Sequence, residues 1–270
     1  MNETVKRTIT LFLLFFFLAF LYVYGNNIAF LSFIYILSIF SFYEWISIGS
    51  KHIALLPIFI ILISLFHYIN VINIFYLSIL TLIVWIILIY SMIVISDKVK
   101  IFLKKNFTSI GFFIFTSFFL ILINMFPISN TLHYDNNLVD HKLYILFLVT
   151  LLSSIDIFAY ISGKAFGKNK ITISISPNKT LEGFIGSYFL TVLIFILLST
   201  AIELVWTYLD LFYLTIFILL AFFGDLFMSF VKRIYNIKDT GNILPGHGGV
   251  LDRLDSYFPS LPLFYLWFMI

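Results

Sequence analysis

Long apolar segments alternate with short polar ones along almost the whole chain. Apolar runs of about 17–25 residues are long enough to cross the hydrocarbon core of a bilayer as helices. The pattern predicts about nine such spans, at residues 8–25, 28–48, 53–69, 72–96, 107–127, 142–163, 181–203, 208–231 and 257–270. We therefore expect an all-α, polytopic integral membrane protein. We treat residues 1–270 as a single membrane domain, with apolar helices in 1–150 and the chemistry in 151–270.

The first apolar run, 8–25, follows the segment MNETVKR and resembles a secretory signal sequence. It is longer than the apolar region of most signal sequences, and it ends in Gly25-Asn26-Asn27 without a small-x-small cleavage site. We interpret it as a retained first span.

The composition agrees with a membrane protein. Apolar residues make up 62% of the chain and charged residues 11%, and the mean hydropathy is +1.09. Ordinary soluble domains contain roughly 45–50% apolar residues. A single globular core in a chain of this length cannot bury the additional apolar residues. The chain has no cysteine, which excludes a disulfide framework, a thiolate nucleophile and a zinc–thiolate site.

The positions of the basic residues predict the orientation of the chain. With the N-terminus inside, all of the 16 Lys and Arg residues except Lys142 fall in inside segments. The outside loops carry Asp135, Asp140, Glu203 and Asp210 instead. This asymmetry follows the positive-inside rule and predicts an N-in, C-out topology. The net charge of +3 is then explained by basic residues on the inside face, near anionic lipid headgroups. It does not suggest a nucleic-acid partner.

Polar residues become frequent from Asp156 onward, at the inside ends of the predicted helices. Asp156, Tyr160 and Gly163 fall at i, i+4 and i+7, which places them on one helix face. An alternative interpretation is structural, because a hydrogen-bonded intramembrane Asp and glycines that allow close helix packing need no function. The segment Gly163–Lys168 lacks the spacing of a P-loop.

A second polar cluster surrounds the predicted start of the next helix, at Ser176-Pro-Asn-Lys179-Thr180-Leu-Glu182. Helix capping would explain Thr180 and Glu182 without any function. Lys179 is harder to explain in this way, because cations disfavour a helix N-terminus. A Lys beside free backbone N–H groups indicates a phosphate pocket.

A third cluster is a polar stripe on the penultimate span. Asp225, Ser229, Lys232 and Arg233 sit at i, i+4, i+7 and i+8 of an otherwise apolar helix, so the stripe should face the bundle interior or a water-filled cavity. A structural salt bridge between Asp225 and Lys232 is the alternative.

The loop that follows the stripe is rich in glycine and charge. The loop contains Gly246, Gly248 and Gly249. Glycine allows the backbone to approach a ligand closely, as phosphate-binding loops require. Asp225 and Asp252 supply the carboxylate oxygens that Mg²⁺ prefers. His247 is either a general acid or phosphate donor, or a local hydrogen-bonding residue of the turn. Together these groups predict metal-assisted phosphoryl or nucleotidyl transfer on an anionic substrate at the membrane boundary.

The same region carries a recognisable pattern, S-x-x-K-R-x-x-x-x-K-D-x-G-x-x-x-P-G-H-G-G-x-x-D-R-x-D. Its fixed positions are Ser229, Lys232, Arg233, Lys238, Asp239, Gly241, Pro245, Gly246, His247, Gly248, Gly249, Asp252, Arg253 and Asp255. The pattern resembles the signature of the phosphatidate cytidylyltransferases (CDP-diacylglycerol synthases). The segments that begin at Asp156 and Ser176 also resemble that family, and the resemblance covers about a third of the chain.

The resemblance implies the reaction of CTP with phosphatidic acid to give CDP-diacylglycerol and pyrophosphate. It also implies a Mg²⁺ requirement, a second cation (K⁺ or another divalent ion) and a homodimer in the lipid bilayer. We expect the inner membrane of a bacterium, with the active site on the cytoplasmic side.

The residue roles that we expect from the resemblance fall into three groups. The metal-holding pair is Asp225 and Asp252. The cations that neutralise phosphate are Lys179, Lys232, Arg233 and Arg253. The remaining substrate-binding or orienting residues are Asp156, Ser176, Thr180, Glu182, Ser229, Lys238, Asp239, Gly246, His247, Gly248, Gly249 and Asp255.

Two other classes of protein remain open. A polyprenol or dolichol kinase, or an archaeal-type lipid cytidylyltransferase, would share the physics of this site and differ in its lipid acceptor. A transporter would place charges near the bilayer midplane, often in paired repeats. Here the charges gather at one face, and no repeat is evident.

Overall fold

The computed structural model of the chain describes residues 16, 20, 22, 24–49, 54–69, 72–94, 96–125, 141–172, 175–202, 204–244 and 248–268. The predicted first span at 8–25 lies almost entirely outside the described residues. Gly246 and His247, both predicted to bind substrate, also lie outside them.

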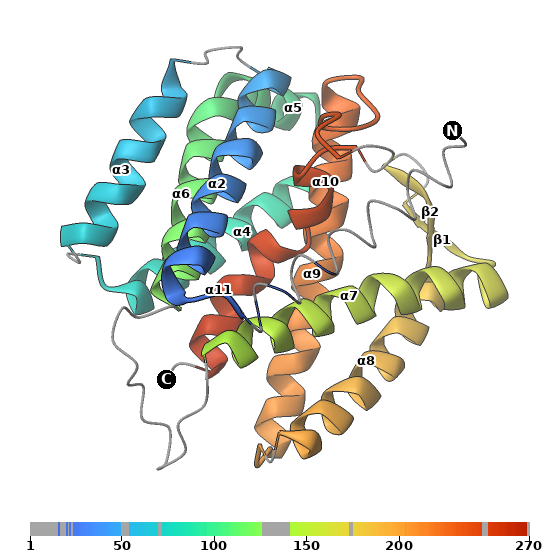
Figure 1. The fold of residues 1–270 in the computed structure, drawn as a ribbon. Helices are drawn as coiled ribbons and strands as arrows, with labels where there is room; N and C mark the ends of the chain where they lie inside the picture. The colour runs from blue at the N-terminus through green and yellow to red at the C-terminus, as the bar shows by residue number, and fades with distance from the viewer. Residues whose placement is uncertain are drawn as a thin grey trace.

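The described chain is mainly helical (Figure 1). Its elements are α2 (Asn27–Gly49), α3 (Leu55–Ile69), α4 (Ile74–Val94), α5 (Asp97–Lys105), α6 (Phe107–Asn124), α7 (His141–Phe166), β1 (Lys170–Thr172), β2 (Ser176–Thr180), α8 (Leu181–Ala201), α9 (Tyr208–Ile234), α10 (Leu251–Leu254) and α11 (Tyr257–Phe268). Within the described residues, 6 helices are long and apolar enough to cross a membrane: α2, α4, α6, α7, α8 and α9. The helical membrane fold is therefore as predicted.

Two further predicted spans are shorter than expected. The predicted span 53–69 corresponds to α3, which has 15 residues. The predicted span 257–270 corresponds to α11, which has 12 described residues and contains Pro262. The count of nine spans and the N-in topology remain predictions.

The helices form a bundle with aromatic contacts in its interior. Figure 1 shows α2, α3 and α6 side by side, and α11 packs against α4, α6 and α9. The Trp45 ring stacks on Phe107 at 4.1 Å, and its Nε1 donates a hydrogen bond to the Phe107 carbonyl. Outward-facing side chains such as Ile61 and Ile86 are also apolar and more than half exposed, as expected of a surface that faces lipid tails.

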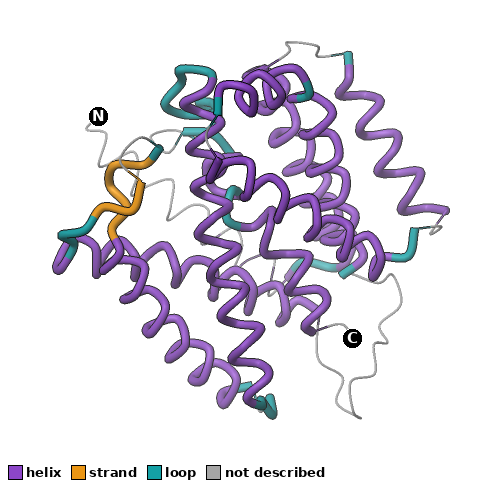
Figure 2. Tube along the Cα trace, turned by 180° about the vertical axis from the view of Figure 1, so that it is seen from behind, coloured by secondary structure: helices purple, strands orange, loops and turns teal. Residues whose placement is uncertain are grey.

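Small residues bring α7 and α8 close together. A Cβ on Gly183 would lie 2.8 Å from the Ala159 carbonyl oxygen and 3.2 Å from the Cα of Gly163. Such close approach is typical of helix pairs in membranes, where dispersion contacts and not water exclusion drive association. The α7–α8 pair leaves the main bundle and carries the hairpin β1–β2 at its far end (Figure 2).

The β1–β2 hairpin departs from the all-α prediction. The two strands are antiparallel, and Lys170 pairs with Thr180. Thr180 then caps α8, because its side chain accepts a hydrogen bond from the Gly183 amide. Capping by Thr180 was one of the two interpretations open from the sequence, whereas the strands were not predicted, since segments of three and five residues are too short to show an alternation.

Candidate active site

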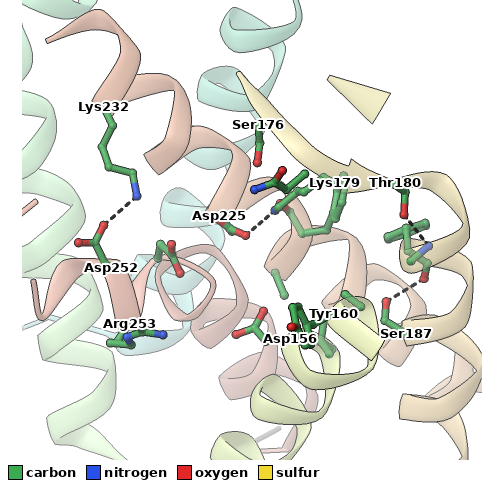
Figure 3. Close-up of a pocket in the computed structure, with 18 of the residues that line it drawn as sticks. Asp156, Tyr160, Ser176, Lys179, Thr180, Ser187, Asp225, Lys232, Asp252 and Arg253 are labelled. Atoms are coloured by element: carbon green, nitrogen blue, oxygen red, sulfur yellow. Dashed lines mark hydrogen bonds and ion pairs between the residues drawn. The ribbon is translucent and has the colours of Figure 1, made fainter. Parts of the chain in front are cut away.

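The helix ends and the hairpin enclose a cavity of about 460 Å³ (Figure 3). Its walls come from α7, β2, α8, α9 and α10, so segments far apart in the sequence meet there. Many of the predicted site residues line this main cavity: Asp156, Ser176, Lys179, Thr180, Asp225, Lys232, Asp239, Asp252, Arg253 and Asp255. Tyr160 lines it too.

Lys179 reaches from β2 to the polar stripe of α9. Its Nζ lies 2.5 Å from Oδ2 of Asp225 and 4.6 Å from the centroid of the Phe222 ring. Ser229, one turn along α9, donates to Oδ1 of Asp225 at 3.5 Å. The side chains of Lys179 and Asp225 are 20% and 32% exposed, so the pair is accessible from the cavity and also ties the hairpin to α9.

Lys232 pairs with Asp252. The salt bridge between Lys232 and Asp225, which was the structural alternative from the sequence, is not formed. The Nζ of Lys232 lies 2.8 Å from Oδ1 of Asp252, and the two side chains are 16% and 10% exposed. The other oxygen, Oδ2, accepts hydrogen bonds from the Thr240 amide and hydroxyl and from the Gly249 amide. Asp252 therefore organises the loop around itself.

The environment of Asp252 keeps its carboxyl ionised. Burial acts to raise its pKa, but the hydrogen bonds from Lys232, Thr240 and Gly249 and the charge of Lys232 outweigh burial. The pKa of Asp252 consequently lies below its ordinary value.

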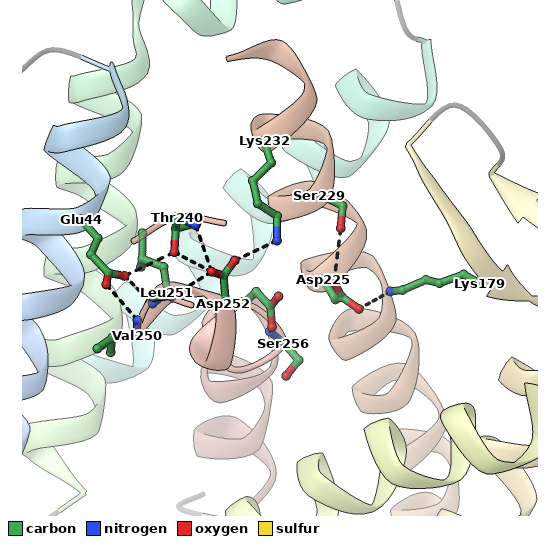
Figure 4. Close-up of polar contacts among 12 residues, drawn as sticks. Glu44, Lys179, Asp225, Ser229, Lys232, Thr240, Val250, Leu251, Asp252 and Ser256 are labelled. Atoms are coloured by element: carbon green, nitrogen blue, oxygen red, sulfur yellow. Dashed lines mark hydrogen bonds and ion pairs between the residues drawn. The ribbon is translucent and has the colours of Figure 1, made fainter. Parts of the chain in front are cut away.

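Glu44 in α2 holds the same loop from the other side (Figure 4). Its Oε1 accepts the Val250 amide at 3.0 Å, and its Oε2 accepts the Leu251 amide at 2.9 Å and the Thr240 hydroxyl at 3.3 Å. Glu44 is 2% exposed. It supplies the acceptors that the first amides of α10 lack, because the N-cap residue Val250 has no side-chain cap.

Glu44 was not among the site residues predicted from the sequence. The signal was present, because Glu44 is the single acidic residue in an otherwise uncharged apolar segment, 27–49. Ionisable residues at such depth are functional-site candidates. What the sequence does not show is that the partners of Glu44 lie about two hundred positions away, in the loop and in α10.

The described glycines of the loop make room for protein side chains. Gly248 has φ +85°, a left-handed conformation that favours glycine. A Cβ on Gly249 would collide with the Thr240 hydroxyl and the Glu44 carboxylate, and Gly241 also packs against Glu44. The described glycines therefore allow close approach of the backbone to Glu44 and Asp252, and their approach to a ligand stays a prediction.

Three of the carboxyl groups that line the main cavity lie near one another, those of Asp156, Asp225 and Asp255. Asp255 is 8% exposed. Burial, and then the charges of Asp225 and Asp156, raise the pKa of Asp255 well above its ordinary value. The positive charge of Lys179 acts in the opposite direction. The site thus concentrates more carboxylate than its own cations compensate.

This concentration of hard oxygen donors is chemically suited to a divalent cation. Among the described residues, however, no group of three or more His, Asp or Glu side chains stands in metal-binding geometry. Both oxygens of Asp252 accept protein hydrogen bonds, and Asp225 pairs with Lys179. A cation at either carboxylate would share it with, or displace, a lysine.

Several predicted site residues lie outside the main cavity. Lys238 is exposed on the loop. Glu182 accepts hydrogen bonds from the Lys168 and Asn169 amides and so fastens the end of α7 to the start of α8. Arg233 lines a different cavity, where its Nε donates to the Ile175 carbonyl at 3.3 Å. Its neighbour Lys232 faces the main cavity.

Comparison with known proteins identifies the family of the chain. A sequence model described as the cytidylyltransferase family matches residues 5–270. The chain belongs to the cytidylyltransferase family. The resemblance seen in the motifs is thereby confirmed.

Curated relatives from several bacteria bear the name phosphatidate cytidylyltransferase. The relative from Bacillus subtilis (strain 168) is 42% identical over 123 residues, which are 45% of this chain and 46% of that protein. The relative from Staphylococcus epidermidis (strain ATCC 12228) is 42% identical over 126 residues, 44% of this chain and 46% of that protein. The one from Staphylococcus aureus (strain COL) is 41% identical over the same length. The matched segment spans just under half of these relatives.

Proposed function

We propose that this protein transfers the cytidylyl group of CTP to phosphatidic acid, giving CDP-diacylglycerol and pyrophosphate. The observation that carries the proposal is the composition of the main cavity, where three cations, Lys179, Lys232 and Arg253, face the same space as five aspartates. Such a site suits phosphate groups together with their counter-ions. The shared family and the names of the bacterial relatives support the reaction.

The reaction needs charge neutralisation more than it needs a base. The phosphate monoester of phosphatidic acid is already anionic near neutral pH, so one of its oxygens can attack the α-phosphorus of CTP directly. The bond between the α-phosphorus and the bridging oxygen then breaks, and pyrophosphate leaves with that electron pair. Lys179, Lys232 and Arg253 would reduce the repulsion between the two polyanions and stabilise the leaving pyrophosphate.

The ion pairs of the site suggest how substrate engages it. Lys179 and Lys232 are paired with Asp225 and Asp252, so each lysine is held in place before phosphate arrives. Phosphate would compete with the carboxylate for the lysine, which leaves carboxylate oxygens available to a cation. The apolar side chains Phe184 and Phe222 in the cavity wall would accept the acyl-glycerol part of the lipid.

A Mg²⁺ ion fits this proposal, held by Asp225 and Asp252. When bound, the ion would bridge and neutralise substrate phosphates. Asp156, Asp239 and Asp255 line the same cavity and would orient the cations or hold a second ion, K⁺ or another divalent. His247 and Gly246 remain proposed substrate contacts from the sequence motif.

The proposal includes a membrane arrangement. We place nine spans in a bacterial inner membrane, with the N-terminus inside and the main cavity on the cytoplasmic side, because the basic residues gather there. A homodimer is proposed on the family resemblance.

An acceptor panel tests the function. The full-length chain, purified in detergent, is given CTP, Mg²⁺ and either short-chain phosphatidic acid, a polyprenol or a polyprenyl phosphate, and lipid products are identified by mass spectrometry. We expect CDP-diacylglycerol from phosphatidic acid. Product from polyprenol alone would replace this proposal with a kinase.

A matched pair of hairpin variants ties the activity to the main cavity. Lys179→Gln should lower kcat/KM by about 10²–10³-fold, as removal of a charge-stabilising group commonly does. Lys170→Gln removes a lysine from the other strand of the hairpin, where it is exposed and lies away from the cavity, and should stay near the natural value. Equal activity in both variants would contradict the role of Lys179.

A further inference from the structure

A second cavity, of about 390 Å³, lies between α5 and the C-terminal end of α9. We call it the α5–α9 cavity. Its cations are Lys100 and Lys104 from α5 and Arg233 from α9, and its apolar wall includes Ile101, Phe230 and Ile234. A wall of this kind beside clustered cations is the chemistry of a site for an anionic amphiphile.

The α5–α9 cavity is separate from the main cavity. The two share no lining residue, but consecutive residues of α9 divide between them: Lys232 faces the main cavity and Arg233 the α5–α9 cavity. Successive side chains on an α-helix point about 100° apart. The two cavities therefore lie on different sides of α9.

The helix α5 has the character of a segment at the membrane boundary. It is nine residues long, begins at the N-cap Ser96 and ends with Lys104 and Lys105. Leu103 is buried against the bundle, whereas Ile101 and Phe102 are 65% and 58% exposed. A short helix that alternates lysines with exposed apolar side chains is typical of the headgroup region of a bilayer. Figure 1 shows α5 at the same end of the molecule as the α9–α10 loop.

The cations of the α5–α9 cavity are only weakly engaged by protein groups. Lys100 pairs with Asp97 at 3.1 Å, but the two side chains are 43% and 92% exposed, and such exposed pairs contribute little. Lys104 lies over the Tyr235 ring at 5.9 Å. Arg233 donates its Nε to the Ile175 carbonyl, and a guanidinium carries further N–H donors. Three cations thus face one carboxylate, an imbalance that an anion would correct.

We propose that the α5–α9 cavity binds the phosphate of an anionic phospholipid from the surrounding leaflet. The phosphate contacts Lys100, Lys104 and Arg233, and the glycerol and first acyl carbons lie on the wall of Ile101 and Phe230. This ligand is distinct from the substrate in the main cavity, so the proposal does not depend on the proposed reaction.

Binding of this kind would have a structural consequence for the hairpin. Arg233 contacts the β1–β2 turn through Ile175, and the same hairpin carries Lys179 to Asp225. A phosphate that fixes Arg233 therefore also steadies the wall of the main cavity.

A lysine-swap experiment tests the proposal. The full chain in a neutral detergent is titrated with phosphatidylglycerol, and bound lipid is counted by native mass spectrometry. Lys100→Gln/Lys104→Gln should weaken the tightest phosphatidylglycerol site about thirtyfold, from roughly 1 kcal/mol for each lysine near a phosphate. Lys98→Gln/Lys105→Gln removes the same charge from exposed positions of the same helix outside the cavity, and should change binding less than threefold.

The outcomes separate a site from a general basic surface. Equal losses in the two double variants would show attraction by net charge alone and would overturn the proposal, as would no loss in either. Phosphatidylcholine should show no difference between the variants. If inorganic phosphate at millimolar concentration displaces phosphatidylglycerol, and the cavity shows no preference for phosphatidylglycerol, the cavity binds free phosphate. That result would overturn the proposal of a lipid ligand.

A second variant keeps the test decisive if the double variant does not fold. Ile101→Asn changes an exposed side chain of the wall and leaves every lysine in place. It should weaken phosphatidylglycerol binding by at least fivefold and leave competition by inorganic phosphate unchanged. Unchanged phosphatidylglycerol binding in Ile101→Asn would contradict the apolar half of the site.

Discussion

At the scale of single residues, the site is built from carboxylates that each organise several donors. Asp252 holds Lys232 and the backbone at 240 and 249, and Glu44 holds the start of α10 beside it. Each carboxylate is nearly buried, and a buried acceptor left without its donors costs more than the hydrogen bonds contribute. The groups of the proposed active site therefore depend on Glu44, which does not line the main cavity.

Replacement of Glu44 tests this dependence. Glu44→Gln places an amide NH₂ where a carboxylate oxygen now faces an amide N–H of Val250 or Leu251, so one donor loses its acceptor. We expect a loss of about 1–3 kcal/mol in the free energy of unfolding, together with reduced turnover. Thermal unfolding in detergent and the cytidylyl-transfer assay provide the measurement.

The control for Glu44 is Ser47→Ala on the same helix. Ser47 is exposed and donates only to the Tyr43 carbonyl one turn earlier, so its removal should change stability by less than about 0.5 kcal/mol. An unchanged free energy of unfolding in Glu44→Gln would show that the loop does not need the hydrogen bonds to Glu44.

Residue identities in the motif were predictable from the sequence, but residue directions were not. Asp225, Ser229, Lys232 and Arg233 were predicted to form one stripe, yet Arg233 turns about 80° away from Asp225 on an ideal helix and enters the other cavity. Helix rotation is fixed by the packing of buried neighbours such as Phe230 and Val231. A sequence motif does not specify how its helix is rotated, so the motif also could not predict which carboxylate pairs with Lys232.

At the scale of elements, the long helices were predictable and the short segments were not. Spans of about 20 apolar residues have few alternatives in a membrane, because every backbone group must be satisfied internally. The hairpin β1–β2, the helix α5 and the four-residue α10 are too short or too polar for periodicity to define. These three elements nevertheless supply part of the charged lining of the two cavities, namely Lys179, Lys100, Lys104, Asp252 and Arg253.

The α7–α8 contact gives a prediction at this scale. In Gly183→Ala the new methyl would lie 2.8 Å from the Ala159 carbonyl oxygen, so the helices must separate and carry β2 with them. We expect a loss of about 1–3 kcal/mol in stability and a rise in KM for CTP, measured by thermal unfolding and steady-state kinetics.

Gly163→Ala, on the facing helix, is the matched comparison. Its nearest atom would be the Thr180 hydroxyl oxygen at 3.1 Å, which yields more easily than backbone, so the loss should be smaller. A larger effect at Gly163 than at Gly183 would contradict the packing described for α7 and α8.

At the scale of the whole molecule, the proposed topology places α5 and the α9–α10 loop inside and the α8–α9 turn outside. Because the chain has no cysteine, single cysteines report the side of the membrane directly. In right-side-out vesicles, an impermeant maleimide should label Tyr208→Cys, which is 90% exposed at the start of α9. Lys98→Cys should be labelled only after the vesicles are permeabilised. Labelling of both positions from one side would contradict the N-in orientation.

The central claim is that the main cavity joins the α-phosphorus of CTP to a lipid phosphate. The most direct measurement is a pair of reactions with phosphatidic acid, one with CTP labelled at the α-phosphorus and one with CTP labelled at the γ-phosphorus. The account predicts that the α label enters the lipid fraction and that the γ label leaves as pyrophosphate. Appearance of the γ label in the lipid would show phosphoryl transfer by a kinase and would contradict the account.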